Sequence, residues 1–314
     1  MSSTTWDWGI PSLFTLPVSA VHGHGTGDLL DACLQYFPPE EDEEEEDDAI
    51  KVAVIGKPNA GKSSLVNKIL GEERVIVSNV AGTTRDAIDS YFENDQGRFV
   101  FIDTAGIRRK SKVEEDIEKY SVLRATLAIE RSDVCLILID ATEGVTEQDA
   151  KIAGIAHERG KGIIIVVNKW DAIENNDKTM REYDSEVRRV LSFMPYAEIM
   201  YVSAETGQRL NKLYDKIDMV IENQTLRVAT GVLNEIMAEA VAMQQPPSDK
   251  GKRLKLYYIT QVAVKPPTFV IFVNDKELMH FSYTRYLENK IREAFGFRGT
   301  SLKFFIRERK EKDR

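Results

Sequence analysis

The sequence predicts an α/β fold with a mostly parallel sheet and helices on both faces, followed by a small α+β domain. Continuous apolar runs at residues 134–139 and 163–167 are typical of strands that are buried on both faces of a sheet. Helical patterns at residues 147–158, 179–193 and 208–222 lie between and after these runs. Strands that alternate with helices favour a parallel sheet, because each helix carries the chain back to the edge where the next strand begins.

The first strand of this sheet, residues 50–55, ends at a glycine-rich turn that opens a helix at residues 62–70. The turn matches the pattern G-x-x-x-x-G-K-[ST], in the strand-to-helix context that this motif requires. Its glycines allow backbone N–H groups to face phosphate oxygens, Lys62 would contact the β- and γ-phosphates, and the Ser63 hydroxyl suits Mg²⁺. The predicted phosphate-binding residues are Gly56, Lys57, Pro58, Asn59, Ala60, Gly61, Lys62, Ser63 and Ser64.

The next strands are expected at residues 90–92 and 99–102, with a turn at residues 94–97 between them. Asp103-Thr104-Ala105-Gly106 follows the second of these strands, 40 residues after the phosphate loop. Asp103 is expected to hold the Mg²⁺ shell through water, and the Gly106 N–H to sense the γ-phosphate. Thr104, Ala105 and Ile107 are predicted to line the nucleotide with them.

A polar stretch, Gly82-Thr83-Thr84-Arg85-Asp86, lies between the first helix and the second strand. In a nucleotide-binding protein of this kind it predicts a switch segment that is ordered by the γ-phosphate and its metal ion. We expect Thr84 to complete the Mg²⁺ shell when the γ-phosphate is present.

Asn168-Lys169-Trp170-Asp171 ends the apolar run at residues 163–167 and indicates which base is bound. The Asp171 carboxylate only accepts hydrogen bonds, so it suits the N1–H and exocyclic amine of guanine. Adenine lacks this donor pair and would leave the charge unpaired. Asn168 would brace the loop and the base, the Lys169 stem would lie against the ring, and the last predicted contacts are Trp170, Ser203 and Ala204. Together these motifs predict a P-loop GTPase domain that binds GTP or GDP with Mg²⁺.

The C-terminal section has its own pattern. Apolar residues every four positions from 228 to 240 and from 283 to 295 predict two helices, and residues 254–264, 268–273 and 302–306 predict strands. The order is α-β-β-α-β, a small α+β domain. Gly296-Phe297-Arg298-Gly299 matches the G-x-x-G that clamps nucleic acid in KH domains, but it joins a helix to a strand, so we interpret it as a helix cap and turn.

Charge is distributed unevenly along the chain. The net charge is −9, yet residues 40–48 are all acidic, and residues 225–314 carry 17 Lys and Arg against 10 Asp and Glu. Lys and Arg of the basic section, namely Arg253, Lys255, Lys303, Arg307 and Arg309, are candidates for contacts with RNA phosphates. The two cysteines and four histidines predict neither a disulfide framework nor a zinc site. The chain shows no membrane-length apolar run and no secretory signal, so we expect a cytoplasmic protein.

The motifs from Gly56 to Arg314 resemble the Der (EngA) family of bacterial ribosome-assembly GTPases, within the wider Era- and TrmE-type group. The residues that carry the resemblance are the phosphate loop, Val77 to Asp86 and Asn168 to Asp171 for its second GTPase domain, and Phe269 to Asp275, His280 to Tyr283, Arg285 to Asn289 and Ala294 to Phe297 for its KH-like domain. The resemblance implies a role in assembly of the large ribosomal subunit, with that subunit and its RNA as partners. We expect neither DNA nor a membrane as a partner, and a monomer.

Two further roles come from this resemblance. Asn59 would help to hold K⁺ against the phosphates, where the cation would offset charge in the transition state as an arginine finger does. Ile107 stands where Ras-like enzymes place a water-orienting Gln, so another group must act, and Glu118 is the candidate. The predicted catalytic residues are Lys62, Thr84, Gly106 and Glu118, and the predicted metal ligands are Ser63, Thr84, Asp103 and Asn59.

The resemblance also divides the chain. Residues 1–36 contain only the end of a first GTPase domain, residues 37–48 form an acidic linker, residues 49–224 the GTPase domain and residues 225–314 the KH-like domain. Two alternatives remain open. One is a nucleotide-gated module that binds RNA or the ribosome and hydrolyses GTP incidentally. The other is a TrmE-like GTPase of tRNA modification, although the C-terminal Cys of that family is missing.

Overall fold

The computed structural model describes residues 49–72, 89–94, 97–102, 117–174, 176–249 and 251–309 of the 314. Ala49–Arg314 forms one compact unit. The predictions for residues 1–36 and for the acidic linker at residues 37–48 lie outside the described residues.

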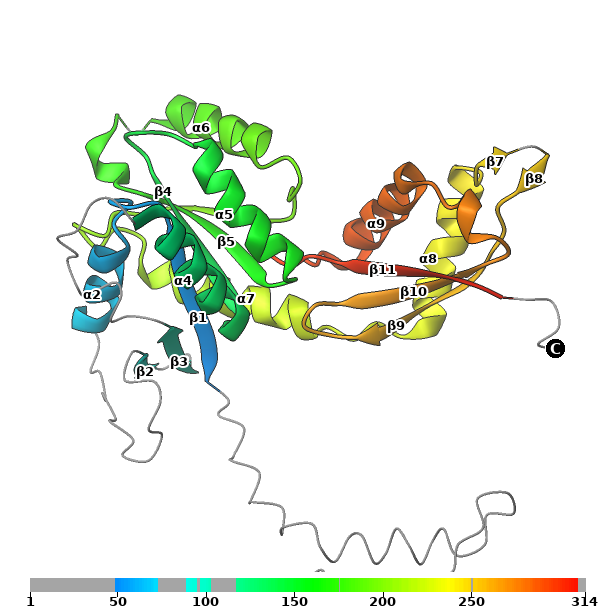
Figure 1. The fold of residues 1–314 in the computed structure, drawn as a ribbon, viewed down its shortest axis with the longest axis horizontal. Helices are drawn as coiled ribbons and strands as arrows, with labels where there is room; N and C mark the ends of the chain where they lie inside the picture. The colour runs from blue at the N-terminus through cyan, green and yellow to red at the C-terminus, as the bar shows by residue number, and fades with distance from the viewer. Residues whose placement is uncertain are drawn as a thin grey trace, which may run out of the picture. The chain divides into compact units, whose positions relative to one another are not determined.

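A six-stranded sheet in the order β2-β3-β1-β4-β5-β6 forms the first part of this unit (Figure 1). Its strands are β1 (Ile50–Gly56), β2 (Ser90–Asn94), β3 (Gly97–Ile102), β4 (Val134–Asp140), β5 (Gly162–Asn168) and β6 (Glu198–Tyr201). Every neighbouring pair is parallel except β2 with β3, which is an antiparallel hairpin. The mostly parallel sheet that the apolar runs predict is therefore confirmed, and every residue of β4 and β5 is buried.

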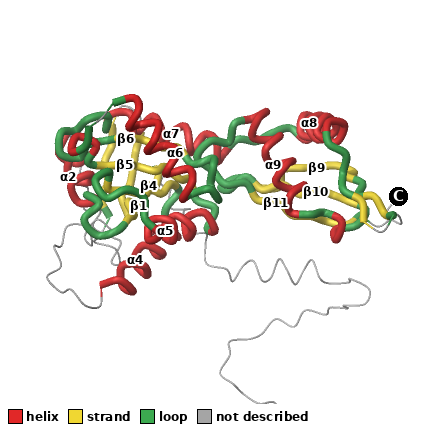
Figure 2. The backbone as a smooth tube through the Cα atoms, turned by 90° about the horizontal axis from the view of Figure 1, so that it is seen from above, coloured by secondary structure: helices red, strands yellow, loops and turns green. Residues whose placement is uncertain are grey.

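Helices cover both faces of this sheet (Figure 2), and the side chains of the strands alternate between the two cores that result. They are α2 (Lys62–Glu72), α4 (Ile117–Arg131), α5 (Glu147–Glu158), α6 (Asp177–Val190) and α7 (Asn211–Thr225), with a short 3-10 turn, η1 (Trp170–Ala172). One core joins alternate β4 residues such as Ile137 to α4, α5 and α6. The other joins Leu136 and Leu138 to α2 and α7. Two buried faces explain why these strands are apolar throughout.

Helix α5 has the predicted bounds because the sequence marks its start. Thr146 and Asp149 form a capping box, in which the Thr146 hydroxyl accepts from the Asp149 N–H and the Asp149 carboxylate accepts from the Thr146 N–H. Helix α6 begins two residues earlier than predicted, since the Asn176 side chain caps it by accepting from the Thr179 N–H at 2.9 Å.

The C-terminal part has the predicted α-β-β-α-β order with one addition. Its main elements are α8 (Thr230–Met243), β9 (Leu256–Ala263), β10 (Thr268–Val273), α9 (Phe281–Phe295) and β11 (Lys303–Glu308), and it also holds the hairpin β7 (Ser248–Asp249) and β8 (Lys252–Arg253) and the turn η2 (Lys276–Leu278). The strands form a sheet in the order β11-β10-β9. The hairpin lies between the helix predicted from residues 228–240 and the strand predicted at residues 254–264.

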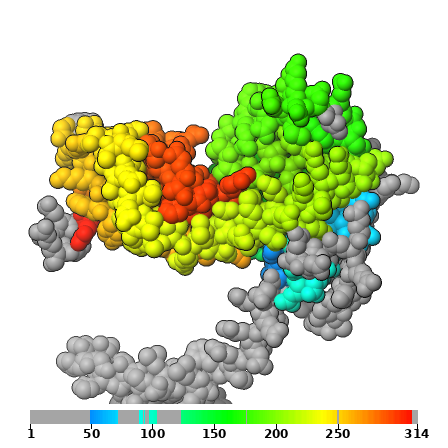
Figure 3. All heavy atoms as spheres, turned by 180° about the vertical axis from the view of Figure 1, so that it is seen from behind, coloured from blue at the N-terminus to red at the C-terminus, as the bar shows by residue number. Residues whose placement is uncertain are grey.

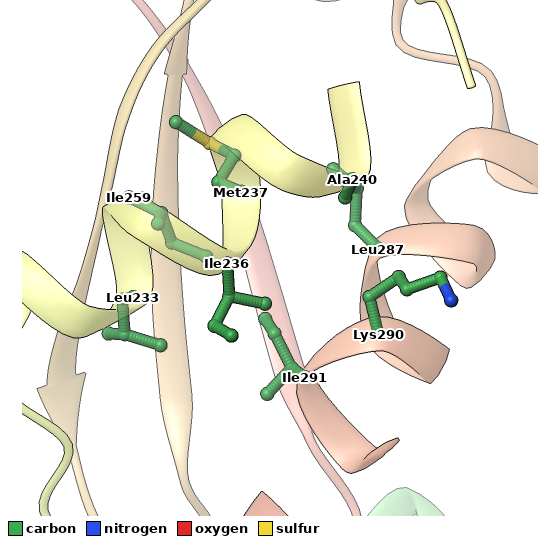
Figure 4. Close-up of a pocket in the computed structure, with 8 residues that line it drawn as sticks. All are labelled: Leu233, Ile236, Met237, Ala240, Ile259, Leu287, Lys290 and Ile291. Atoms are coloured by element: carbon green, nitrogen blue, oxygen red, sulfur yellow. The ribbon is translucent and has the colours of Figure 1, made fainter. Parts of the chain in front are cut away.

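Helices α8 and α9 pack side by side over one face of this sheet, and Figure 3 shows them in yellow and orange-red. The apolar stripe in the sequence predicts the helix α8 correctly, but the residues that turn inward are Leu233, Met237 and Ala240, whereas Val232 is 43% exposed. The seam between the helices, shown in Figure 4, leaves a cavity of only about 10 Å³, so the core is well packed.

Residues 296–301, here called the junction loop, attach this part to the first sheet. Gly296 ends α9 with φ 84° and donates its N–H to the Arg292 carbonyl at 2.8 Å, as a helix cap should. Gly299 donates to the Tyr196 carbonyl at 2.8 Å and accepts from the Ile163 N–H at 2.7 Å. The structure therefore confirms that the G-x-x-G sequence is a cap and turn, and it is packed against the α/β domain.

Candidate functional site

The phosphate loop lies at the carboxyl end of β1. It holds two glycines that no other residue could replace unless neighbouring atoms moved. Gly56 has φ 150°, and a Cβ there would lie 2.5 Å from the Leu138 carbonyl oxygen. Gly61 has φ 94°, and a Cβ there would lie 2.2 Å from Asn168 Nδ2. Both positions need glycine because the backbone must pass close to its neighbours. The result is a tight loop followed by the N-terminus of α2, where backbone N–H groups favour an anion.

Lys62 closes this loop from inside. Its Nζ donates to the Gly56 carbonyl at 2.8 Å and to the Lys57 carbonyl at 2.7 Å. Burial lowers the pKa of Lys62 to about 8, although the nearby Asp149 carboxylate acts in the opposite direction. A phosphate bound beside this partly desolvated ammonium would stabilise it strongly, because the anion favours the charged form of the lysine, which burial disfavours.

The remaining residues of the loop differ in exposure. Ala60 is fully buried, while Pro58, Asn59 and Ser64 are exposed. Asn59 has φ 65°, a conformation that Asn tolerates better than most residues. Ser63, the second residue of α2, is half-buried. Lys57 is nearly buried and pairs with Glu143, with 2.6 Å between Nζ and Oε2; sequence reasoning did not find Glu143.

Asn168 connects the phosphate loop to the predicted base-binding loops. It ends β5, is 1% exposed, and donates from Nδ2 to the Ala60 carbonyl at 2.9 Å. Its Oδ1 accepts from the Ala204 N–H, also at 2.9 Å. One side chain thus fixes the separation between the loops that would hold the phosphates and the base.

Lys169 and Trp170 anchor the next turn from two sides. Lys169 has φ 60°, and its Nζ pairs with the Asp140 carboxylate at the end of β4. Burial raises the pKa of Asp140, but hydrogen bonds from Lys169 and Thr142 outweigh it, so the pKa lies below its usual value. Sequence reasoning missed Asp140, although its place at the end of a buried strand is a usable signal.

Trp170 is 1% exposed and packs in an aromatic cluster, with its ring centroid 4.4 Å from that of Tyr201. Its indole therefore supports the loop rather than facing a ligand. Asp171 follows it and is exposed. Ser203 is fully buried, and its Oγ accepts from the Thr206 N–H at 3.0 Å, which shapes the turn that presents Ala204.

Several predicted site residues are not placed by the structure. Thr84, Asp103, Thr104, Ala105, Gly106 and Ile107 lie outside the described residues. Glu118 belongs to the first turn of α4, where only the backbone is described. The structure brings together a glycine loop, the half-buried Lys62 and an exposed carboxylate, on linked turns at the carboxyl ends of β1, β4 and β5.

Comparison with known proteins agrees with this geometry. A family model described as "50S ribosome-binding GTPase" matches residues 51–169, and one described as the KH-domain-like C-terminal part of EngA bacterial GTPase enzymes matches residues 227–307. GTPase Der of Lachnoclostridium phytofermentans is 70% identical over 95% of this chain and 68% of its own length. The chain belongs to the GTPase Der family. A second member, from Agathobacter rectalis, is 66% identical over 95% of this chain and 67% of its own length.

Membership of the GTPase Der family makes the chain a GTP-hydrolysing enzyme and confirms the α/β P-loop domain with a KH-like domain after it. The chain spans about two thirds of the length of these relatives. Among solved structures, a variant of Aquifex aeolicus Era bound to GDP and AlF₄⁻ is 24% identical, with a TM-score of 0.42, over 83% of this chain and 94% of that one. No helix in the described part of the chain has the length and apolarity to cross a bilayer.

Proposed function

We propose that this protein uses GTP binding and hydrolysis to control its attachment to the large ribosomal subunit during assembly of that subunit. The observation that carries the nucleotide part is the double hydrogen bond of Asn168, to the Ala60 carbonyl and from the Ala204 N–H, both at 2.9 Å. This bond pair links a loop shaped for phosphate to a loop shaped for a base. The family model that matches residues 51–169 supports the ribosomal part.

Each part of the nucleotide has a candidate partner. The exposed Asp171 accepts from the N1–H and amine of guanine, and the Ala204 loop supports the base edge. Lys62 exchanges its bonds with the Gly56 and Lys57 carbonyls for the phosphates. Ser63, with Thr84 and Asp103, would hold Mg²⁺, which offsets phosphate charge when bound. Thr84 and Gly106 would be ordered by the γ-phosphate and released after hydrolysis.

Two catalytic assignments complete the proposal. Asn59, exposed at the tip of the phosphate loop, would hold K⁺ beside the phosphates. Glu118 would orient the attacking water, since the Ile107 side chain has no polar atom that could do so. We expect slow intrinsic hydrolysis that is faster in KCl than in NaCl. Equal rates in both salts, with Asn59→Ala also unchanged, would remove the K⁺ role of Asn59.

Ribosome co-sedimentation tests the proposal as a whole. The full chain is incubated with isolated large subunits in the presence of GDP, GTP or a non-hydrolysable GTP analogue, and the pellet is assayed. We expect retention with GTP and with the analogue, and release after GTP is hydrolysed. Retention that is the same with all three nucleotides would contradict control by the nucleotide.

An assay of subunit maturation separates the main alternative, a nucleotide-gated RNA- or ribosome-binding module in which hydrolysis is incidental. A Glu118→Gln variant that hydrolyses GTP slowly but still supports full subunit maturation would favour that module. The basic composition of residues 225–314 favours a nucleic-acid partner both for the proposed function and for the nucleotide-gated module.

The proposal includes the setting in which the protein works. It would act in the cytoplasm as a monomer, with residues 49–224 as the GTPase domain and residues 225–314 as the KH-like domain. The two family matches, at residues 51–169 and 227–307, support that division. Light scattering of the nucleotide-loaded chain gives its mass directly, and the mass of a dimer would contradict the monomer.

A further inference from the structure

The C-terminal sheet has one covered face and one open face. Its covered face contributes Ile259, Phe269 and Ile271 to the core under α8 and α9. Side chains alternate along each strand, so the residues between these point the other way. The opposite side, here called the open sheet face, carries Tyr258, Thr260, Val270, Phe272, Phe305 and Arg307, and none of them belongs to that core.

Aromatic side chains are grouped on this open sheet face by the strand register. Phe272 pairs with Tyr258 on β9, and their rings are stacked with centroids 4.3 Å apart and planes 13° from parallel. In the next row, Val270 on the central strand is buried at 6% exposure and pairs with Phe305 on the edge strand β11, which is 56% exposed. An exposed phenylalanine beside a stacked pair offers flat apolar surface that the fold itself does not use.

The charge of this face is positive. Arg307 pairs with Phe272 in register and is exposed, and Arg309 follows the same strand and is also exposed. No residue of β9 or β10 is acidic. The single acid of β11, Glu308, belongs to the other side by alternation, where its Oε1 accepts from the Lys276 N–H at 3.1 Å. One exposed phenylalanine and a half-buried stacked pair, beside arginines and without carboxylates on this side of the strands, suit a polyanion that carries flat rings.

The usual nucleic-acid contact of a KH domain is not available here. The G-x-x-G sequence lies in the junction loop, where Gly299 bonds to Tyr196 and Ile163. Arg298, between the two glycines, makes a two-pronged pair with Glu198, with N–O distances of 2.6 and 2.9 Å. The backbone of Gly299 and the Arg298 guanidinium are therefore already bonded within the protein, so an RNA bound to the C-terminal part would need another surface.

We propose that the open sheet face binds an unpaired RNA segment, with bases stacked on Phe305 and against the Tyr258–Phe272 pair, and phosphates contacted by Arg307. Stacking on sheet aromatics is a common way to bind single strands, because every base has a flat face to offer. Duplex RNA would not serve, since its bases are already stacked on each other. The inference rests on the proposed function for the source of the RNA, which is the ribosome.

The test is fluorescence anisotropy of the full chain with a labelled 15-nucleotide RNA of mixed sequence that cannot pair with itself. We expect Phe305→Ala to weaken binding about tenfold, in line with the loss of one stacked base, and Phe305→Tyr to restore it. Arg307→Gln should weaken binding and lower the slope of log affinity against log salt by about 0.7, the change expected for one phosphate contact on a single strand. Phe305→Ala should leave that slope unchanged.

Matched controls come from α9 on the helical side of the same domain. Phe281 is 79% exposed and Arg285 is exposed, so Phe281→Ala and Arg285→Gln remove the same groups elsewhere and should leave RNA affinity unchanged. Equal losses in Phe305→Ala and Phe281→Ala, or equal affinity for a duplex of the same length, would overturn the proposal.

Two outcomes would show whether a negative result contradicts this inference alone or the choice of RNA as the ligand. If Phe305→Ala keeps its RNA affinity while subunit binding still depends on GTP, this inference fails and the proposed function stands. If Phe305→Ala keeps its RNA affinity but loses the subunits, the face contacts a ribosomal protein and RNA is excluded as its ligand. Thermal midpoints and GTPase rates equal to those of the unmodified chain verify that each exposed substitution leaves the fold intact.

Discussion

Replacing Asn168 by alanine should impair both stability and nucleotide binding, because this side chain links two loops. It is 1% exposed, and its two hydrogen-bond partners, the Ala60 carbonyl and the Ala204 N–H, lie at 2.9 Å. Two such bonds contribute about 1–3 kcal/mol together, and each stranded buried group adds a cost of its own. We expect the free energy of unfolding to fall by about 2–4 kcal/mol.

Nucleotide affinity should fall further than stability alone explains, since the phosphate loop and the Ala204 loop lose their fixed separation. Asn234→Ala is the matched control, because Asn234 makes three hydrogen bonds, to the Thr230 carbonyl and to both backbone groups of Ile259, within the C-terminal part. It should lower stability by a comparable amount and leave GDP affinity unchanged.

The assays are urea unfolding and titration with a fluorescent GDP analogue, for the unmodified chain and both variants. Asn168→Ala should show loss in both assays, and Asn234→Ala only in the first. If both variants lose GDP affinity equally, the effect is general destabilisation and the bridging role of Asn168 is refuted. Normal affinity in Asn168→Ala would refute it as well.

Three further predictions follow from the same coordinates. Gly56→Ala should lower the free energy of unfolding by at least about 2 kcal/mol, because its Cβ meets a backbone oxygen at 2.5 Å, whereas Gly144→Ala, at φ 77° with open space around it, should cost only about 1 kcal/mol of strain; chemical denaturation of both variants compares them. Phosphate should raise the pKa of Lys62 from about 8, so GTP binding should take up protons near pH 8.5 and weaken as the pH rises through the higher pKa of the bound state. Calorimetry in buffers of different ionisation enthalpy measures this uptake, and proton release would contradict it. Arg298→Met should leave Glu198 with Lys216 alone and destabilise the junction by about 1 kcal/mol, since solvent screens the 60% exposed Arg298. In the unmodified chain, burial raises the pKa of Glu198, but its two cationic partners lower it by more, so the pKa in the folded state lies below 4.5. The stabilisation is therefore present above pH 4.5 and is lost as the pH falls through the folded-state pKa. Thermal unfolding at pH 7 and pH 4 should therefore show a smaller difference between the variant and the unmodified chain at pH 4.

Elements with strong local signals could be predicted from the sequence. β4 and β5 are apolar throughout because both faces are buried, and α5 starts at a capping box. The sequence does not predict the helix α4, because Leu123 and Leu127 are apolar although they are 56% and 52% exposed. Apolar residues therefore lie on both its buried and its exposed side, and the pattern shows no single apolar face. β6 has four residues, too few to show a period.

The motif residues of the site could be predicted because their chemistry is local to each loop. The support around them could not, since it depends on residues far apart in sequence. The Asn168 bonds span 108 and 36 residues, and the Arg298–Glu198 pair spans 100. Trp170 belongs to a binding motif, yet its side chain packs in the core. Only its packing on Tyr201 reveals this difference.

Base selection by Asp171 is the central claim, and nucleotide affinity measures it most directly. The triphosphates of guanosine, adenosine and xanthosine are titrated into the unmodified chain and into Asp171→Asn. The unmodified chain should prefer GTP over ATP by at least about 10³-fold, because adenine leaves the carboxylate unpaired. Asp171→Asn should favour the xanthine nucleotide, whose additional carbonyl accepts from the new amide. An unmodified chain that holds ATP as tightly as GTP would contradict the account.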